Sequence, residues 1–159
     1  MNTATSSANR PRMLLPPRGF LLALLAQVPV IVSNWPLQPN PLAMVAGAAL
    51  IAWGALLNIW AERLFRWGAT GVCPFSPTTV LVRRGPFKLS RNPMYLGLIA
   101  ISVGVTLATG VFSNIWISVA LAIWLHYAYV LPEEGFMHDR FGAEYEQYTE
   151  RVPRWMLFK

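Results

Sequence analysis

Two short segments of the chain carry residue types that could bind a charged organic ligand. The first is RRGPFKLSRNPMYLG, Arg83 to Gly97, and the second is LPEEGFMHDRFGAEYEQYTERVPRW, Leu131 to Trp155. In the first segment Pro93 suits the first turn of a helix, because its missing N–H would have no partner there in any case. Asn92 then takes the N-cap position, and the free backbone amides beyond it can hold an anion such as a carboxylate. Arg91 adds a forked hydrogen-bond donor, so this segment predicts an anion site.

The second segment opens with Pro132 and two carboxylates, Glu133 and Glu134, at a predicted helix start where the helix dipole favours negative charge. Further along the segment, aromatic side chains with polar edges could form walls: Tyr145, Tyr148 and Trp155. An anion site, a carboxylate pair and aromatic walls together suit a zwitterionic, partly aromatic ligand. Each element also has a purely structural alternative. The basic residues could determine topology, the glutamates could cap a helix, and the aromatic residues could form an interfacial belt.

The composition indicates which kind of protein must position these segments. Of the 159 residues, 55% are hydrophobic and only 13% are charged, and the mean hydropathy is +0.41. Soluble domains carry roughly 25% charged residues, so this surface is too poor in charge to face water on all sides. The net charge of +6 does not indicate a nucleic-acid partner, because the basic residues stand beside apolar runs and are better placed to face anionic lipid. A single cysteine, Cys73, excludes a disulfide framework and a paired-thiol metal site.

Four apolar runs predict an all-α integral membrane protein with about four transmembrane helices, each needing about 20 mostly apolar residues. The runs are Gly19–Trp35, Leu42–Ala61, Met94–Thr109 and Val111–Leu131, and a C-terminal amphipathic helix is expected from Pro132 to about Glu150. The third run is short for a full span. The first run also resembles a secretory signal, but it lacks a convincing cleavage site, so an uncleaved span kinked at Pro29 is expected. The spans hold almost no ionisable side chains, His126 being the main candidate.

The length is enough for one domain, 1–159, made of a basic tail (1–18), a helical hairpin (19–61) and a motif-bearing catalytic part (62–159). The tail and the loop after the second run are rich in arginine, whereas the two hairpin turns hold no charge. Short basic loops stay cytoplasmic. Both termini and the ligand-binding segments are therefore expected at the cytoplasmic face of an inner or cytoplasmic membrane.

Four glycines in the second and third runs allow close helix packing, either within one chain or between two. They are Gly47, Gly54, Gly97 and Gly104. This alternative leaves the oligomeric state open.

Taken in order, the motifs GPF, SRNPMYLG, PEE, FGAEYEQY and VPRW, with two spans between the second and third, resemble the isoprenylcysteine carboxyl methyltransferase and phospholipid methyltransferase family. Its members are membrane-embedded enzymes that use S-adenosylmethionine. The resemblance covers roughly Pro77 to Trp155, half of the chain. The family's Arg-His-Pro-x-Tyr-x-Gly falls on Arg91, Asn92, Pro93, Tyr95 and Gly97, and its paired glutamates fall on Glu133 and Glu134.

The chain departs from this family pattern at Asn92, where histidine is the commonest residue. Asparagine can donate and accept hydrogen bonds but cannot titrate near neutrality. A proton switch at this position is therefore in doubt, whereas a role in holding the cofactor survives.

The resemblance implies methyl transfer from S-adenosylmethionine to a lipophilic or amphiphilic acceptor, such as a lipid amine, carboxylate or thiol. The transfer is a direct displacement, so the protein mainly orients the reacting groups. Arg91, Asn92 and Tyr95 would hold the methionyl end of the cofactor, with Pro93 and Gly97 completing that part of the site. Glu133 or Glu134 would bind its amino or ribose hydroxyl groups. The C-terminal segment would close over the site and exclude water, through Tyr145, Tyr148 and Arg154.

His126 and Glu133 are the candidates for a catalytic group. They are seven residues apart, and on one regular helix this spacing returns to the same face about 10 Å away. His126 could accept a proton from an amine or thiol acceptor, or it could instead hydrogen-bond a neighbouring helix.

Two other functions remain open from the sequence. One is a non-catalytic membrane protein or small transporter that retains the fold. The other is a membrane reductase with a nicotinamide cofactor, against which the missing glycine-rich dinucleotide motif argues. In each case the polar segments are too short for a separate recognition domain, so a small or lipid-embedded substrate is favoured over a folded protein.

Overall fold

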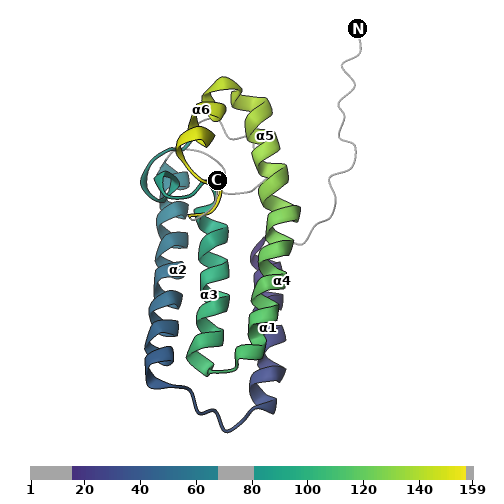
Figure 1. Cartoon of the computed structure of the whole chain (residues 1–159). Helices are drawn as coiled ribbons and strands as arrows, with labels where there is room; N and C mark the ends of the chain where they lie inside the picture. Colours follow the sequence, from purple (N-terminus) through teal and green to yellow (C-terminus); the bar gives the residue numbers. More distant parts are fainter. Residues whose placement is uncertain (1–15, 68–80, 157–159) are drawn as a thin grey trace.

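The computed structural model of the chain describes residues 16–67 and 81–156, where the regular elements are helices (Figure 1). The elements are α1 (Pro16–Ser33), α2 (Pro41–Trp67), the 3-10 turn η1 (Gly85–Lys88), α3 (Pro93–Thr109), the 3-10 turn η2 (Phe112–Asn114), α4 (Ile115–Leu125), the π-helical turn η3 (His126–Val130), α5 (Leu131–Phe141) and α6 (Ala143–Arg151). The predicted all-α class is confirmed. The predicted tail up to residue 15, and Cys73, lie outside the described residues.

Three helical segments are long and apolar enough to cross a membrane: Pro16–Ser33, Pro41–Leu64 and Phe112–Phe141. These segments support the predicted integral membrane class. Helix α3 is also apolar, but its 17 residues fall short of the about 20 that a full span needs. The fourth span therefore stays a prediction.

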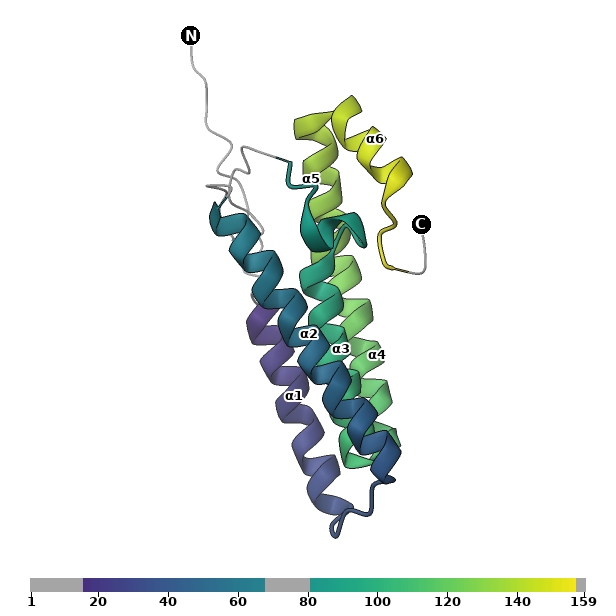
Figure 2. The same cartoon turned by 90° about the vertical axis from the view of Figure 1, so that its left-hand side faces the viewer.

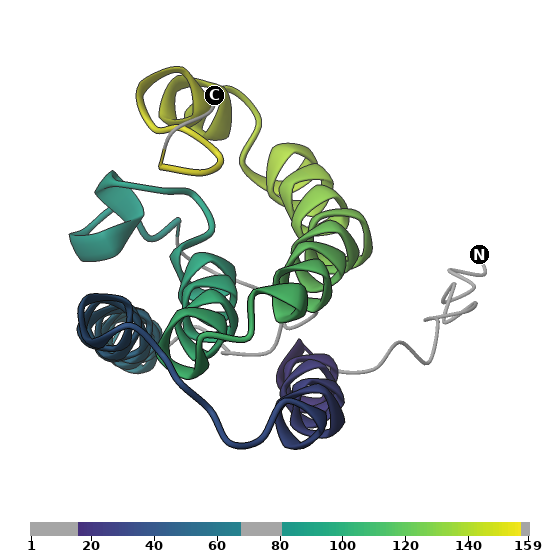
Figure 3. The same ribbon diagram turned by 60° about the horizontal axis from the view of Figure 1, so that its bottom comes forward.

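The long helices run side by side, with α3 between α2 and α4 and with α1 against α4 (Figure 3). The connections from α1 to α2 and from α3 to α4 lie at one end of the bundle, while α5, α6 and the loop before α3 gather at the other (Figures 1 and 2). We call the second end the polar end. The connections 34–40 and 110–114 hold no charged residue, as expected. Antiparallel helices therefore bring both predicted ligand-binding segments to the same end.

Glycines let α2 and α3 approach to backbone contact within one chain. A Cβ atom on Gly47 would lie 2.6 Å from the carbonyl oxygen of Gly104, and one on Gly54 would lie 2.5 Å from that of Gly97. Distances this short leave no room for a side chain. The close packing that the sequence allowed within or between chains is thus found within the chain, and it fixes the position of the motif at the start of α3.

Three predicted helix boundaries differ from the structure by more than two residues. Helix α1 begins at Pro16, inside the predicted basic tail 1–18, and not at Gly19. Helix α2 continues past Ala61 to Trp67, because Glu62, Arg63 and Leu64 are good helix formers outside the apolar run. The fourth apolar run was expected to end at Leu131, but α4, η3 and α5 form one continuous rod (Figure 1).

The reason for this continuous rod is the π-helical turn. In it the N–H of Leu131 donates to the carbonyl of His126, five residues back. The wider turn accommodates Pro132, which has no N–H and would clash with a carbonyl four residues earlier in a regular α-helix.

The prediction of a single amphipathic helix from Pro132 to about Glu150 is wrong. The chain breaks it at Gly142, whose φ of +48° is a backbone conformation that side-chain-bearing residues rarely adopt. Helix α6 therefore turns back over the polar end, where Figure 2 shows it beside α5.

The bundle interior is more polar than the sequence suggested. Gln27 of α1 is fully buried, and its Nε2 donates to the hydroxyl of Ser102 in α3 at 2.8 Å. That hydroxyl also lies 2.8 Å from the hydroxyl of Ser118 in α4. This chain of hydrogen bonds joins three helices, as polar residues between membrane helices commonly do.

Candidate functional site

The carboxylate of Glu134 joins three separate parts of the chain at the polar end. Arg154 donates to its Oε2 from Nε at 3.0 Å and from a terminal guanidinium nitrogen at 2.8 Å. Asn92 Nδ2 donates to Oε1 at 3.1 Å, and a guanidinium nitrogen of Arg91 lies 3.5 Å from Oε2. We call these four residues the carboxylate clamp. It ties the start of α3 and the C-terminal segment to α5.

The clamp is shielded from solvent. The side chains of Arg91 and Glu134 are 9% and 12% exposed, and that of Arg154 is 31% exposed. Charges in such surroundings are strongly attracted, but each is costly if its partner is removed. Glu134 is therefore held by the protein itself and serves to position the segments around it.

Glu133, the other member of the pair, has a different partner. Its Oε2 accepts a hydrogen bond of 3.0 Å from the hydroxyl of Tyr95, which is 7% exposed. The pair thus divides into one carboxylate that holds the chain together and one that a single phenol orients.

Replacing Tyr95 with phenylalanine is expected to lower the free energy of unfolding by about 1–3 kcal/mol, because it leaves a shielded oxygen of Glu133 without its hydrogen-bond donor. Denaturant unfolding in detergent micelles, followed by circular dichroism, measures the change. The matched control is Tyr127→Phe, which removes a phenol from a residue that is 67% exposed and should cost little. Equal losses in the two variants would show that the Tyr95–Glu133 bond is not a stabilising contact.

The loop before α3 (residues 81–92) is attached to the C-terminal segment through Ser90, a residue to which the sequence motifs assign no role. Ser90 is fully buried, and its hydroxyl donates to the carbonyl of Arg154 at 2.8 Å and accepts from the N–H of Asn92 at 3.1 Å. The N–H of Arg91 donates to the carbonyl of Pro153 at 3.0 Å. In the sequence, Ser90 could have been recognised as a structural residue only by its position directly before the Arg-Asn-Pro motif.

The tyrosines of α6 face inward and pack against the loop before α3. Tyr145 and Tyr148 are 5% and 6% exposed, and the hydroxyl of Tyr148 donates to the carbonyl of Phe87 at 2.7 Å. Burial and the negative charge of Glu134 raise the pKa of Tyr145 to about 12, against the opposing effect of nearby Arg91. Burial likewise raises the pKa of Tyr148. Both phenols therefore stay protonated at neutral pH, with Tyr145 beside the clamp and Tyr148 fastening α6 to the loop.

Three predicted positions at the start of α3 have local roles that the sequence did not distinguish. Pro93 does begin the helix and Asn92 does take the N-cap position, but the Asn92 side chain makes no cap hydrogen bond and donates to Glu134 instead. A Cβ atom on Gly97 would lie 2.2 Å from Nδ2 of Asn58 and 2.6 Å from the carbonyl oxygen of Gly54. The close approach at Gly97 is thus to helix α2.

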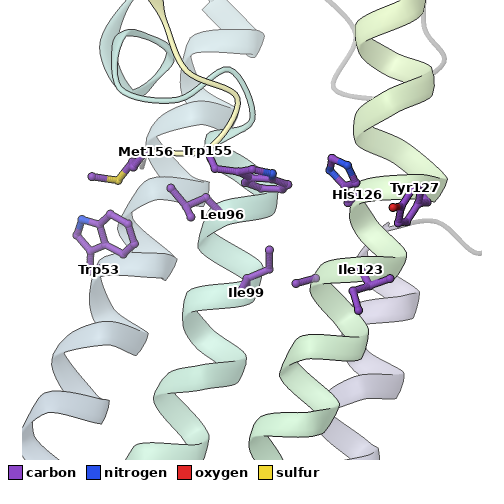
Figure 4. A pocket seen from close by; sticks show the side chains of 9 residues that line it. Trp53, Leu96, Ile99, Ile123, His126, Tyr127, Trp155 and Met156 are labelled. Atoms are coloured by element: carbon purple, nitrogen blue, oxygen red, sulfur yellow. The ribbon is translucent and has the colours of Figure 1, made fainter. Parts of the chain in front are cut away.

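Beneath the polar end lies an apolar pocket of about 650 Å³, which we call the side groove (Figure 4). Helices α2, α3 and α4, the π-helical turn and the C-terminal segment all contribute to it. Its lining residues are Trp53, Leu96, Ile99, Ala122, Ile123, His126, Tyr127, Trp155 and Met156. Pockets of 300–1,000 Å³ are typical of small-molecule sites.

His126 and Trp155 face each other across the top of the side groove, with ring centroids 6.1 Å apart (Figure 4). The Nδ1 atom of His126 is buried and has no hydrogen-bond partner among the described residues. This nitrogen therefore does not make the alternative that the sequence left open, a hydrogen bond from His126 to a neighbouring helix, which stays a prediction for the other ring nitrogen. The π-helical turn also alters the helical spacing between His126 and Glu133, so the regular seven-residue relation does not apply.

Comparisons with known proteins agree with these motifs. The chain matches the phospholipid methyltransferase family over residues 42–144. Protein-S-isoprenylcysteine O-methyltransferases B and A of Arabidopsis thaliana are 33% and 36% identical to it over 81 residues, which make up 49% of this chain and 40% of each relative. The match therefore spans well under two thirds of either relative's length. No solved structure matches the chain.

The family match covers more than half of the chain, and it includes α2 from its second residue, α3, the continuous rod and the first residues of α6. The resemblance first suggested by the ordered motifs is thereby confirmed, and the chain belongs to the phospholipid methyltransferase family.

Proposed function

We propose that this chain catalyses methyl transfer from S-adenosylmethionine to a lipophilic acceptor at the polar end of its helical bundle. The observation that carries the proposal is that, in a member of this family, a polar cluster and an apolar groove lie next to each other. A cluster of charged and polar side chains around Glu133 and Glu134 lies directly above an apolar groove whose wall includes Trp155 of the same C-terminal segment.

The residues around the clamp suit S-adenosylmethionine. Arg91 lies beside Glu134, yet its Nε is buried without a hydrogen-bond partner among the described residues, so it can donate to the cofactor's carboxylate. Glu133 is the member of the pair that we assign to the cofactor's ammonium or ribose hydroxyl groups, because Glu134 is already held by the clamp. When bound, the cofactor supplies a methyl group activated by the positive charge on sulfur.

The chain's own contribution is then orientation and the exclusion of water. The clamp holds the loop before α3, α5 and the C-terminal segment together, and Tyr148 fastens α6 to the same loop. Reactions of this kind gain most from a fixed alignment of the reacting groups. Tyr95 orients Glu133 for the same purpose.

The acceptor's apolar part would lie in the side groove. The groove walls are apolar apart from His126, Tyr127 and the indole N–H groups, and α3 and α4 that form them are apolar helices of the bundle. A lipid tail or another alkyl group suits such a wall. We further propose that α3 completes a fourth span and that the arginine-rich polar end faces the cytoplasm, since short basic loops stay on that side.

The experiment is methyl transfer by the purified full-length protein in lipid nanodiscs, with S-adenosylmethionine labelled in its methyl group. Extraction and chromatography then identify the labelled product. We expect label in a lipid fraction of the wild type and a loss of about 100-fold in Glu133→Gln, because small misplacements of reacting groups have effects of this size. The matched control is Glu150→Gln, which removes an exposed carboxylate of α6 and should leave the rate unchanged.

Calorimetric titration of the same preparations with S-adenosylmethionine provides a second readout. The wild type and Glu150→Gln should bind it, and Glu133→Gln should bind it more weakly. If the wild type binds no S-adenosylmethionine, the proposed function is wrong, and a non-catalytic member of the family becomes the better description.

A further inference from the structure

One histidine, His126, lines the side groove at the π-helical turn. His126 begins the π-helical turn, and its ring lies 6.1 Å from that of Trp155 and 5.0 Å from that of Tyr127. Its buried Nδ1 lacks a partner among the described residues, although a buried polar atom without a hydrogen bond costs about 1–3 kcal/mol. Turns of the π type occur frequently at functional sites.

Among the described residues that line the groove, His126 is the one whose side chain, an imidazole, can accept and later release a proton. Helix α2 contributes Trp53, α3 contributes Leu96 and Ile99, and the C-terminal segment contributes Trp155 and Met156, none of which titrates. On its own rod, Tyr127 adds a phenol to the lining. Further along this rod Glu133 is bound to Tyr95, and Arg154, which neighbours Trp155, is bound to Glu134.

The lining also disfavours an acceptor that is already an anion. Among the described residues, no lysine or arginine lines the groove. At the polar end Arg91 is assigned to the cofactor's carboxylate, and Arg154 is bound to Glu134. Burying a carboxylate without a cationic partner is costly. An acceptor that enters uncharged, or that loses a proton on the way to reaction, fits this wall better.

We infer that His126 accepts the proton of the methyl acceptor, and that the acceptor is therefore a lipophilic molecule with an N–H or S–H group rather than a carboxylate. This inference rests on the proposed function. The acceptor's lone pair forms the new bond to the methyl carbon, while the bond from that carbon to sulfur breaks and its electron pair stays on sulfur as a neutral thioether. The proton leaves nitrogen or sulfur for an imidazole nitrogen of His126, and the resulting imidazolium later releases it to water.

The first arm of the test compares three acceptors of equal chain length: decylamine, decanethiol and decanoate. The full-length protein is placed in nanodiscs of phosphatidylcholine and phosphatidylglycerol, which contain no amine acceptor, and supplied with labelled S-adenosylmethionine. We expect transfer to the amine or the thiol, but not to decanoate, at a rate that rises with pH through one histidine titration.

The second arm uses variants. His126→Gln should lower kcat by about 100-fold or more, the usual contribution of a positioned proton acceptor, and should abolish the pH step while leaving calorimetric binding of S-adenosylmethionine unchanged. The control is His138→Gln, because His138 is exposed and pairs with Glu146 on α6. It should retain the wild-type rate and pH profile.

The third arm reads out His126 without catalysis. The chain has only two histidines, so the ¹⁵N-histidine spectrum of His138→Gln reports His126 alone. Adding decylamine or decanethiol without S-adenosylmethionine should shift this resonance, and adding decanoate should not. The NMR measurement and the acceptor and pH profiles of the wild type use protein in which His126 is intact. They therefore test the inference even if His126→Gln fails to fold.

Several outcomes would overturn the inference while methyl transfer itself stands. One is transfer to decanoate alone, and another is an unchanged rate and pH profile in folded His126→Gln. A third is a His126 resonance that shifts with neither decylamine nor decanethiol. Failure of the wild type to bind S-adenosylmethionine is a separate result, which would refute the proposed function and this inference together.

Discussion

Replacing Glu134 with alanine is expected to lower the free energy of unfolding by about 3–5 kcal/mol, the range found when one partner of a buried ion pair is removed. The variant leaves the guanidinium groups of Arg91 and Arg154 facing each other without their shared carboxylate. It also frees the amide of Asn92. We therefore expect S-adenosylmethionine binding to be lost as well, because the loop, α5 and the C-terminal segment are no longer held together.

Denaturant unfolding in micelles and calorimetric titration measure the two effects. The control is Glu144→Ala, whose carboxylate is 52% exposed and pairs with Arg83 at the surface. Surface pairs are worth about 0–1 kcal/mol, so this variant should stay close to wild type. A double-mutant cycle of Glu134→Gln with Arg154→Gln should give a coupling energy above about 1 kcal/mol. Equal destabilisation by Glu134→Ala and Glu144→Ala would refute the positioning role of the clamp.

Replacing Gly97 with alanine is expected to destabilise the protein by about 3 kcal/mol, at the upper end of the usual effect of overpacking. The new methyl group would collide with the carbonyl oxygen of Gly54 and with Nδ2 of Asn58. Neither can move freely, because the backbone of α2 is helical and the Asn58 amide already donates to that same carbonyl at 2.9 Å. Helices α2 and α3 must therefore separate, which displaces the motif at the start of α3.

A second glycine makes a matched control for this effect. Gly135 lies in α5 with nothing within 4 Å of the position of an added Cβ atom. Gly135→Ala should be neutral, or stabilising by up to about 1 kcal/mol, since alanine favours a helix more than glycine does. Thermal unfolding in micelles compares the two. A melting temperature for Gly97→Ala at or above that of Gly135→Ala would contradict the close packing of α2 and α3.

Much of the architecture could be predicted from the sequence, because membrane helices are encoded by local composition. A helix satisfies its own backbone hydrogen bonds, so an apolar run of sufficient length specifies it without reference to the rest of the chain. The four apolar runs correspond to α1, α2, α3 and the α4 part of the rod, and the charge-free turns lie together at the end away from the motifs. The helix start at Pro93 is likewise predictable from local sequence, because proline suits the first turn of a helix.

The path of the chain through the polar end was less predictable, since it depends on the backbone conformation of individual residues. The sequence of the fourth run does not reveal that a π-helical turn carries the rod past Pro132, or that Gly142 breaks the amphipathic helix in two. Both features decide how α6 returns over the site. A proline usually indicates a helix boundary, and only the widened turn allows this one to lie inside a continuous rod.

The sequence by itself determined which residues form the candidate site, through motifs whose order resembles one family. Only the tertiary structure decided what each of these residues contacts. It showed that Glu134 is held by Arg91, Asn92 and Arg154 while Glu133 is oriented by Tyr95. These contacts join residues 20 to 43 positions apart in the chain, and hydrogen bonds over such separations depend on how helices pack, which no local pattern encodes.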